Sequence, residues 1–220
     1  MARRATRGRR APLSRERVLR AAVALADADG IESLTMRGLA SRLQVEAMSL
    51  YNHVDTKDDI LDGMLEVVAG EFEEPDTAAD WKAAVRQRAI SAHDVLVRHP
   101  WSSIQWATRI DVGPARMRYM DAMLRELREA GFAPGRIEVA FHTVQNHIVG
   151  HALQESTFPF DAAELPAMSA RYLEAFPVDD FPDLAAHIRY HMETPDGGVS
   201  SFEFGLDAIL DALERTRGPA

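Results

Sequence analysis

The 220-residue sequence predicts an all-α protein, and three observations support this. Apolar residues recur at intervals of three and four along most of the chain, which is the spacing of one buried helix face. Prolines and several glycines stand between these segments, where helices begin and end. No segment shows the alternation of polar and apolar residues that marks a strand. With 46% hydrophobic residues, the chain can form one large domain or two small ones.

The first predicted helix covers residues 14–29. Ser14 is suited to cap its N-terminus with the side-chain hydroxyl, and Gly30 is suited to end it. Its apolar residues form one stripe, on which the next two helices are expected to pack. The stripe consists of Val18, Leu19, Ala22, Val23, Leu25 and Ala26.

Residues 34–60 predict a helix capped by Thr35, a turn at residues 44–46 and a second short helix at residues 47–53. Leu50 of the second helix is expected to point inward, and the other side chains are small, polar or aromatic. Such an exposed face suits the reading of base edges and phosphates in a DNA major groove, whereas an ordinary two-helix corner has no reason to present it. The residues expected to face bases are Ala47, Met48, Ser49, Asn52, Thr35 and Arg37; those expected to hold phosphates are Tyr51, His53 and Lys57.

The charge of the chain is divided unevenly. Residues 1–60 contain eleven basic and eight acidic residues, a charge of +3, whereas residues 61–220 carry −12. A small basic segment attached to an acidic body is typical of a nucleic-acid reader with a separate second domain. Residues 1–13 contain five arginines with glycine and proline, so they are expected to form a disordered arm. The arm either contacts DNA or is a solubilising tail.

The remainder of the chain also divides into helices. Thr56 begins the next helix, and Lys57 at its start is expected to lie close to the end of the short helix at residues 47–53. Polar or proline-rich breaks are expected at residues 73–80, 158–166 and 177–182. The predicted helices cover residues 56–72, 81–99, 101–108, 114–130, 134–155, 183–192 and 200–215.

The segment at residues 34–60 resembles the helix-turn-helix of TetR-family transcriptional regulators. The matching residues are Leu34, Thr35, Leu39, Ala40, Leu43, Val45, Ser49, Leu50, Tyr51, His53, Lys57, Ile60 and Leu61. The later segments WKAAVRQRAI, RHPW, LREAGF, VGHALQE and FEFGLDAILDALE are similar to the ligand-binding domain of the family's tetracycline-repressor-like branch. The resemblance implies a DNA-binding domain at residues 14–60, joined by a connecting helix to a ligand-binding and dimerisation domain at residues 61–220.

Two helices, residues 134–155 and 200–215, carry more apolar surface than one buried face requires. Gly150 would allow another helix to approach closely. The family resemblance implies that these helices pair with their symmetry mates in a four-helix dimer interface; the alternative is a monomer with one thick core. The expected interface residues are His147, Gly150, His151, Phe202, Leu206, Ile209, Leu210 and Leu213.

A candidate ligand site combines aromatic side chains with a few polar groups, as small-molecule sites do. The resemblance implies that a stripe on the helix at residues 134–155 faces an inducer. Where tetracycline repressors place a metal-coordinating histidine, this chain has Gln105, so tetracycline–magnesium is not expected as the inducer. The candidate lining consists of Glu138, Phe141, His142 and Gln145 from the stripe, with Trp101, Trp106, Arg109 and Met117.

The histidines form two pairs at i, i+4 spacing, His147 with His151 and His187 with His191. This spacing can hold a metal ion, but no third ligand accompanies either pair, so interface or core histidines are expected. The chain has no cysteine and no catalytic or phosphate-binding motif. Accordingly, we expect no enzyme activity, cofactor or metal. A helical metal-dependent enzyme using His142, His147 and His151 is the competing hypothesis.

The expected function is a ligand-responsive transcriptional regulator, most simply a repressor that a small molecule releases from a palindromic operator. Its expected partners are double-stranded operator DNA, a second copy of the chain and an unknown effector. A ligand-independent DNA-binding dimer is a further alternative. No run of 18 apolar residues predicts a membrane span, and no secretory signal follows the N-terminal arginines. The expected location is the cytoplasm, in association with the nucleoid.

Overall fold

The structure is a computed structural model that describes residues 12–75, 80–110, 113–157, 164–174, 176–193 and 200–217. Within these ranges the regular structure is helical, as predicted: eleven α-helices and one short 3₁₀ helix. Most of the arginine-rich arm, residues 1–11, lies outside the described residues. The chain forms two compact units. The first contains residues 1–72 and 98–121, and the second contains residues 73–97 and 122–220.

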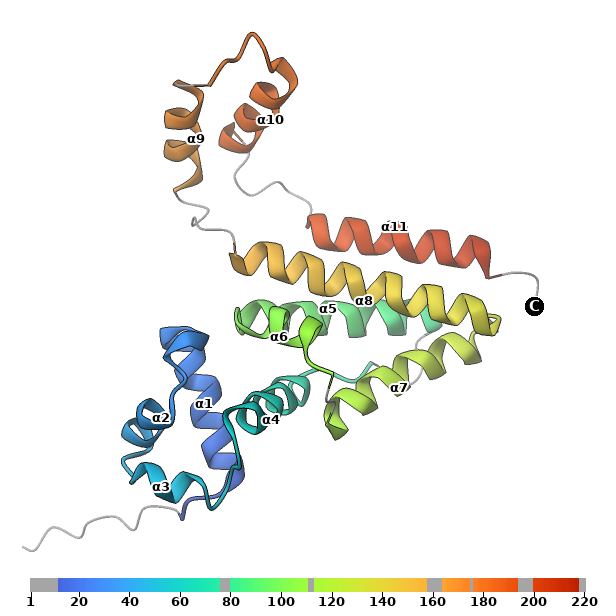
Figure 1. Ribbon diagram of the computed structural model, residues 1–220. Helices are drawn as coiled ribbons and strands as arrows, with labels where there is room; N and C mark the ends of the chain where they lie inside the picture. The colour runs from blue at the N-terminus through green and yellow to red at the C-terminus, as the bar shows by residue number, and fades with distance from the viewer. Residues whose placement is uncertain are drawn as a thin grey trace, which may run out of the picture. The chain divides into compact units, whose positions relative to one another are not determined.

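The first unit is built around α1 (Arg15–Asp29), which packs against both α2 (Met36–Leu43) and α4 (Lys57–Ala69) (Figure 1). The short helices η1 (Ile31–Ser33) and α3 (Ala47–Leu50) connect these elements. All six residues of the predicted α1 stripe are buried. The unit also contains α6 (Ser102–Thr108) and the first turns of α7 (Pro114–Glu129).

Hydroxyl side chains define where three of these helices begin. Ser14 and Thr35 cap α1 and α2 as predicted, because each oxygen accepts a hydrogen bond from the backbone N–H three residues later. Thr56 caps α4 in the same way, at 3.0 Å from the Asp59 nitrogen. Each cap of this kind stabilises a helix by about 1 kcal/mol. Gly30 ends α1 with φ at 80°, a left-handed backbone that favours glycine.

The turn between α2 and α3 depends on one residue in an unusual conformation. Gln44 has φ 58° and ψ 48°, in the left-handed region. Its N–H donates to the Ser41 carbonyl at 3.1 Å, and the Val45 N–H donates to the Ala40 carbonyl at 3.0 Å. This is the Schellman pattern, usually made with glycine. It fixes the angle at which α3 leaves α2.

Two helices are shorter than predicted. The helix predicted at residues 47–53 ends at Leu50, because the Leu50 carbonyl accepts from both the His53 and Val54 N–H groups and closes a tight turn. Helix α4 ends at Ala69 rather than at residue 72. After Gly70 the backbone changes to i, i+3 hydrogen bonds, the tighter pattern found at helix ends.

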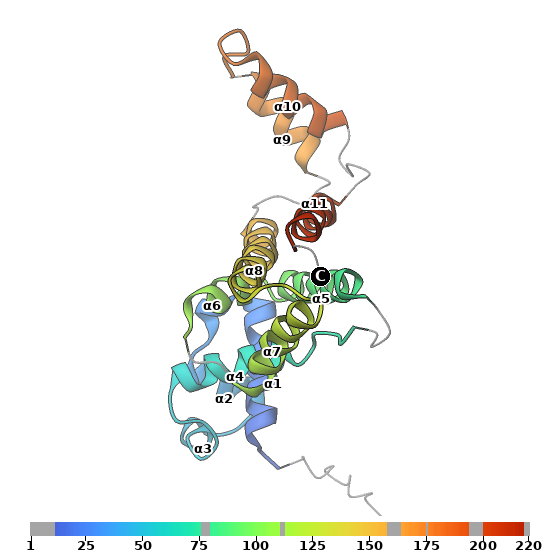
Figure 2. The same ribbon diagram turned by 90° about the vertical axis from the view of Figure 1, so that its right-hand side faces the viewer.

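The second unit contains most of α5 (Trp81–Arg98), the end of α7, α8 (Pro134–Thr157) and α11 (Ser201–Thr216). Helices α8 and α11 pack side by side, as both views show (Figures 1 and 2). Arg86 of α5 binds Glu203 at 2.6 Å and Asp207 at 2.7 Å on α11. Lys82 also pairs with Asp211. A row of ion pairs therefore holds α5 against α11.

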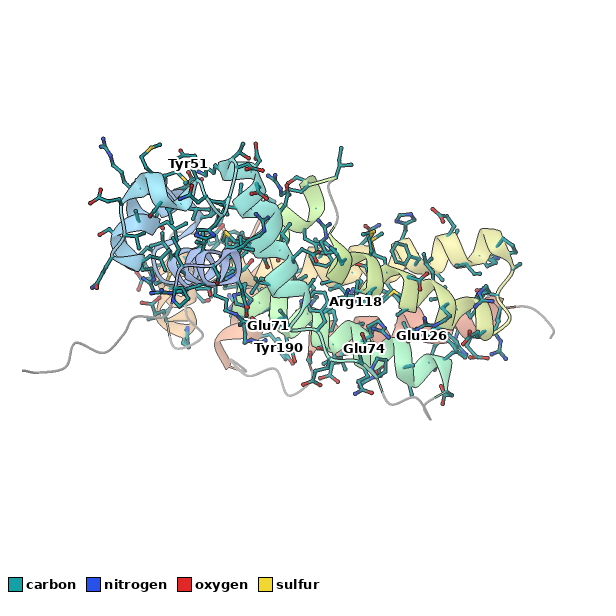
Figure 3. All side chains as sticks on the ribbon, turned by 90° about the horizontal axis from the view of Figure 1, so that it is seen from below. Tyr51, Glu71, Glu74, Arg118, Glu126 and Tyr190 are labelled. Carbon is teal, nitrogen blue, oxygen red and sulfur yellow. The ribbon has the colours of Figure 1, made fainter. Side chains whose placement is uncertain are left out.

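One buried charge lies in the core of the second unit. The Arg88 side chain is 2% exposed and contacts Glu126 of α7 at 2.7 Å and Glu74 at 3.2 Å. Figure 3 labels both glutamates. Removing either partner would leave a buried charge poorly compensated, which is costly.

Helices α9 (Leu165–Glu174) and α10 (Pro182–Glu193) pack against each other. Helix α9 was not predicted from the sequence, which indicated a loop at residues 158–166. Pro166 is the second residue of α9, in the first turn, where proline costs no helical hydrogen bond. Residues 158–163 of that predicted loop lie outside the described residues.

We predict that Gln44→Val lowers the free energy of unfolding by about 1–2 kcal/mol, because a β-branched side chain is strained in the left-handed region. Gln44→Gly is the matched control and should not destabilise the protein, since glycine adopts this conformation freely. Urea denaturation of the two variants checks this. Equal losses for valine and glycine would contradict the role given to the Gln44 backbone.

An ion pair joins the start of α1 to the start of α4. Arg15 donates to both carboxylate oxygens of Asp59, at 2.5 and 2.8 Å, and to the His53 carbonyl at 3.1 Å. Asp59 also accepts from the Asp55 N–H at 2.9 Å. The Arg15 guanidinium lowers the pKa of the Asp59 carboxyl. This one pair therefore fixes the turn that follows α3.

We predict that Asp59→Asn destabilises the protein by about 1 kcal/mol at pH 7, the upper range for a partly exposed pair. Because folding lowers the pKa of Asp59, its contribution is complete above the unfolded value of about 4 and is lost as the pH falls below it. Thermal denaturation at pH 7 and pH 3 measures the difference between wild type and variant. A difference that stays the same at pH 3 would refute the assignment.

Candidate nucleic-acid interface

The exposed surface of the first unit follows α3 and the turn after it. Leu50 is buried, whereas Met48 is 74% exposed and Tyr51 is 47% exposed. Asn52 is also exposed, and Ala47 and Ser49 are half-buried. Figure 3 shows Tyr51 at the outer edge of this unit. A large apolar side chain, a phenol and an amide thus lie together in solvent.

Some polar groups around α3 already form hydrogen bonds within the protein, and others remain available to bind DNA. The Thr35 hydroxyl accepts from Gly38 at 3.0 Å, so its first role is to cap α2. The Ser49 hydroxyl donates to the Glu46 carbonyl at 2.6 Å. Arg37 and Lys57 are exposed and form no ion pair with any residue that the structure describes. These two cations can therefore bind phosphate without breaking an existing contact.

Four of the predicted ligand-lining residues lie in the first unit. Trp101 is buried, and its indole N–H donates to Asp27 of α1 at 2.8 Å. Trp106 is buried beside Phe72, at 5.3 Å between ring centroids, and the Arg116 guanidinium lies 4.4 Å from its ring centroid. The two tryptophans are thus part of the packed interior.

Arg109 connects the end of α6 to α4. Its side chain donates to Asp62 and, at 3.1 Å, to Asp58, both on α4. It also donates to the Asp58 carbonyl at 3.3 Å. Met117 of α7, in contrast, is 50% exposed. Arg109, one of the predicted ligand-lining residues, is therefore already bound to α4.

A second connection, which was not predicted from the sequence, runs from α4 to α7. Glu66 accepts hydrogen bonds from the backbone N–H groups of Ala115 at 2.7 Å and Arg116 at 3.2 Å. A Cβ atom on Gly113 would lie 2.3 Å from the Glu66 side chain, so a larger residue there would displace this carboxylate. The Gly113-Pro114 pair was the available sequence signal, but spacing alone does not reveal that a carboxylate 47 residues earlier binds this helix end.

The other four predicted ligand-lining residues lie on α8 in the second unit. Phe141 is buried, and Gln145 contacts the Met123 sulfur at 3.7 Å. His142 is exposed and binds Glu138 at 2.9 Å. The stripe therefore runs from the core of this unit to its surface, which is the mixture of apolar and polar groups that the sequence indicated.

The three histidines of the competing enzyme hypothesis point to different partners. His142 binds Glu138, and His147 lies 2.9 Å from the Phe202 carbonyl. His151 lies 3.1 Å from the Ser201 hydroxyl. Their ring nitrogens do not converge, so this set does not form one metal-binding site.

Several residues predicted at a dimer interface are already buried within one chain. Phe202, Leu206, Leu210 and Leu213 belong to the core of the second unit, and this core accounts for their apolar character. Gly150, in contrast, is exposed, and a Cβ atom there would meet nothing within 4 Å. Ile209 is half-buried.

In the described ranges, no helix has the length and apolar character needed to cross a membrane.

Two family profiles match the chain, one in its N-terminal part and one in the remainder. Residues 18–64 match the profile described as "Bacterial regulatory proteins, tetR family". Residues 74–217 match the profile described as "Tetracyclin repressor-like, C-terminal domain". The first match covers α1 to α4, and the second covers α5 to α11.

Individual relatives agree with these profiles. The chain is 33% identical over 210 residues to an HTH-type transcriptional regulator of Saccharopolyspora erythraea, covering 94% of this chain and 86% of the relative. It is 31% identical over 220 residues to the HTH-type transcriptional repressor DrrR1 of Streptomyces coeruleorubidus, covering 96% and 81%. The crystal structure of ActR from Streptomyces coelicolor in complex with actinorhodin has a TM-score of 0.74 and 26% identity, covering 94% of this chain and 98% of ActR.

Proposed function

Because the chain belongs to the TetR family of bacterial transcriptional regulators and is a ligand-responsive repressor, we propose that a homodimer of it binds a palindromic operator through α2 and α3. A small molecule bound among the helices that follow α4 releases it. The exposed surface of α3 is the observation that supports this most directly. We call α2, α3 and the turn after α3 the DNA reader.

The roles within the reader follow from exposure and hydrogen bonding. Met48 of α3 and Asn52 in the turn after α3 extend into solvent, as side chains that contact base edges must. Tyr51, Arg37 and Lys57 are exposed donors suited to phosphates, so we propose Arg37 as a phosphate contact in place of the base contact expected from the sequence. The residues proposed to face bases are Ala47, Met48, Ser49 and Asn52; those proposed to hold phosphates are Arg37, Tyr51, His53 and Lys57.

Two copies of the reader are required because each carries little positive charge. A two-fold dimer presents its readers to two half-sites of a palindrome. An exposed stripe on α8, containing Val139, Thr143, Asn146 and Gly150, supports a dimer contact there. Val139 is 53% exposed, and Phe204 of α11 is 69% exposed. The α8 stripe and Phe204 are the proposed dimer contact, in place of the four predicted interface residues that are buried, Phe202, Leu206, Leu210 and Leu213.

The effector is proposed to be a small organic molecule. ActR has been solved with actinorhodin, and the same overall fold here supports an effector in the helical body. Gln105 stands where tetracycline repressors have a metal-binding histidine, so an effector that binds without a magnesium ion at this position is favoured. Phe141, His142 and Gln145 remain the proposed lining on α8.

The signal is proposed to reach DNA through α4. Arg109 binds the first two turns of α4, and Glu66 on the third turn binds the start of α7. Lys57, the first residue of α4, belongs to the proposed phosphate contacts. An effector that shifts α6 or α7 would therefore move the end of the reader. Effector binding and DNA binding are coupled reciprocally, so DNA should weaken effector affinity by the same factor by which the effector weakens DNA affinity.

We predict that Tyr51→Ala and Lys57→Ala each weaken operator binding by roughly tenfold, the value of a lost hydrogen bond to a charged group. Lys57→Ala should also reduce the slope of log affinity against log salt by about one per reader, because one phosphate contact disappears. Asn52→Ala should instead change the preferred sequence and leave the salt slope unchanged. Fluorescence anisotropy with labelled operator DNA at several salt concentrations measures all three.

Arg128→Ala is the control for lost positive charge, because Arg128 lies on α7 in the second unit and pairs with Glu129. It should leave operator affinity and salt slope unchanged. If Arg128→Ala and Lys57→Ala have the same effect, or if neither reader variant alters affinity, the reader has been placed wrongly.

A further inference from the structure

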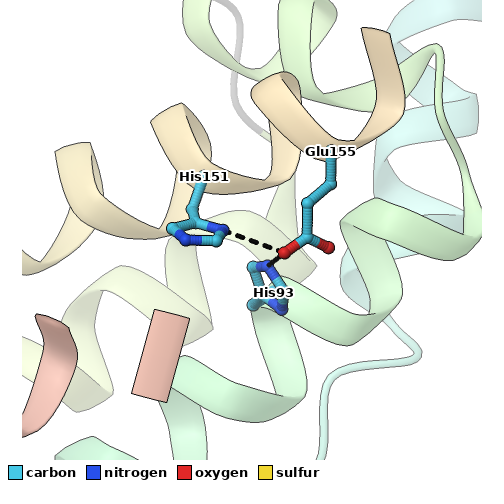
Figure 4. A group of neighbouring side chains, drawn as sticks. All are labelled: His93, His151 and Glu155. Carbon is cyan, nitrogen blue, oxygen red and sulfur yellow. Dashed lines mark ion pairs between the residues drawn. The ribbon is translucent and has the colours of Figure 1, made fainter. Parts of the chain in front are cut away.

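Three metal-ligating side chains converge in the second unit, apart from every residue assigned above to DNA or effector. His93 lies on α5, and His151 and Glu155 lie one turn apart on α8 (Figure 4). Glu155 Oε1 is 2.9 Å from His151 Nδ1 and 3.5 Å from His93 Nε2. The three ligand atoms all lie within 4.8 Å of one another.

The opposite nitrogen of each ring already has a partner. His93 Nδ1 lies 3.3 Å from an Asp94 carboxylate oxygen, and His151 Nε2 lies 3.1 Å from the Ser201 hydroxyl. A proton on each outer nitrogen leaves a lone pair on each inner one, facing Glu155. Metal-binding histidines are oriented in this way, by an acceptor bound to the second nitrogen.

The two inner nitrogens are buried, and both face the same polar atom, Glu155 Oε1. The His93 side chain is only 8% exposed, and its ring stacks on Phe202 at 3.8 Å with 12° between the planes. The ring therefore cannot turn toward solvent.

We propose that His93, His151 and Glu155 bind one divalent transition-metal ion of the zinc type. Tetrahedral zinc with ligands at about 2.0–2.1 Å requires ligand atoms about 3.3 Å apart, and the two measured separations of 2.9 and 3.5 Å bracket that value. Two imidazoles and one carboxylate favour zinc, cobalt or iron over magnesium or calcium. Glu155 is 42% exposed, so the fourth position opens to water.

The ion would join α5 to α8, and its presence does not depend on DNA reading or on an effector. Spacing along the sequence could not reveal this site, because His93 lies 58 residues before His151. His147, which precedes His151 by four residues, contacts the Phe202 carbonyl instead. The i, i+4 pair that matters is His151 with Glu155.

The test is zinc binding to full-length protein freed of metal by chelation. Isothermal titration calorimetry should give one zinc per chain and no binding of magnesium at the same concentration. Cobalt should give the visible absorption of a tetrahedral site. Zinc should also raise the melting temperature, since it binds the folded state.

Two variants keep the proposal testable without risk to the core. Glu155→Gln replaces an exposed ligand with a neutral one of the same shape and should abolish tight zinc binding. Asp94→Asn changes an exposed carboxylate that orients His93, and should weaken zinc by about 10–100-fold. His187→Ala, on α10, is the control that should bind zinc as wild type does.

Zinc binding lost in Glu155→Gln, weakened in Asp94→Asn and retained in His187→Ala establishes the site. Unchanged zinc affinity in Glu155→Gln overturns it, as does equal binding of zinc and magnesium. Loss of zinc in His187→Ala would place the ion elsewhere and would also overturn it.

Discussion

The first unit depends on the way acidic residues of α4 are bound from three directions. Arg15 of α1 binds Asp59 at the start of the helix, Arg109 at the end of α6 binds Asp58 and Asp62, and Glu66 binds the backbone start of α7. Each contact crosses between elements far apart in the sequence. We propose that a shift of any one of these elements moves α4, and with it the turn that ends the DNA reader.

This arrangement explains how a weakly charged reader can be controlled. The reader has few cations, so its proposed affinity depends on meeting two half-sites at a fixed spacing. Under the proposed function, a small displacement of α4 lowers affinity because the second half-site is no longer met. A protein with a strongly basic surface would keep much of its non-specific affinity for DNA after the same displacement of α4.

Local chemistry made much of the fold predictable. The hydroxyls of Ser14 and Thr35 and the conformation of Gly30 place the first helices, since caps depend on neighbouring residues. The exposed face of α3 was equally visible from its side chains. Glu66 at the start of α7 and His93 beside Glu155 were not, because each contact joins residues tens of positions apart and no periodicity records it. Four leucine and phenylalanine positions assigned to a partner proved to be core, because apolar spacing does not say which surface covers a helix.

The most direct test of the α4 linkage is hydrogen exchange of backbone amides in Glu66→Ala compared with wild type. The Ala115 and Arg116 amides lose their acceptor and should exchange faster. If α4 transmits the change, the Asp55 and Asp59 amides at its other end should also exchange faster, while α11 amides stay protected. Faster exchange confined to residues 115 and 116 would show that the two ends of α4 are independent, and would contradict the linkage.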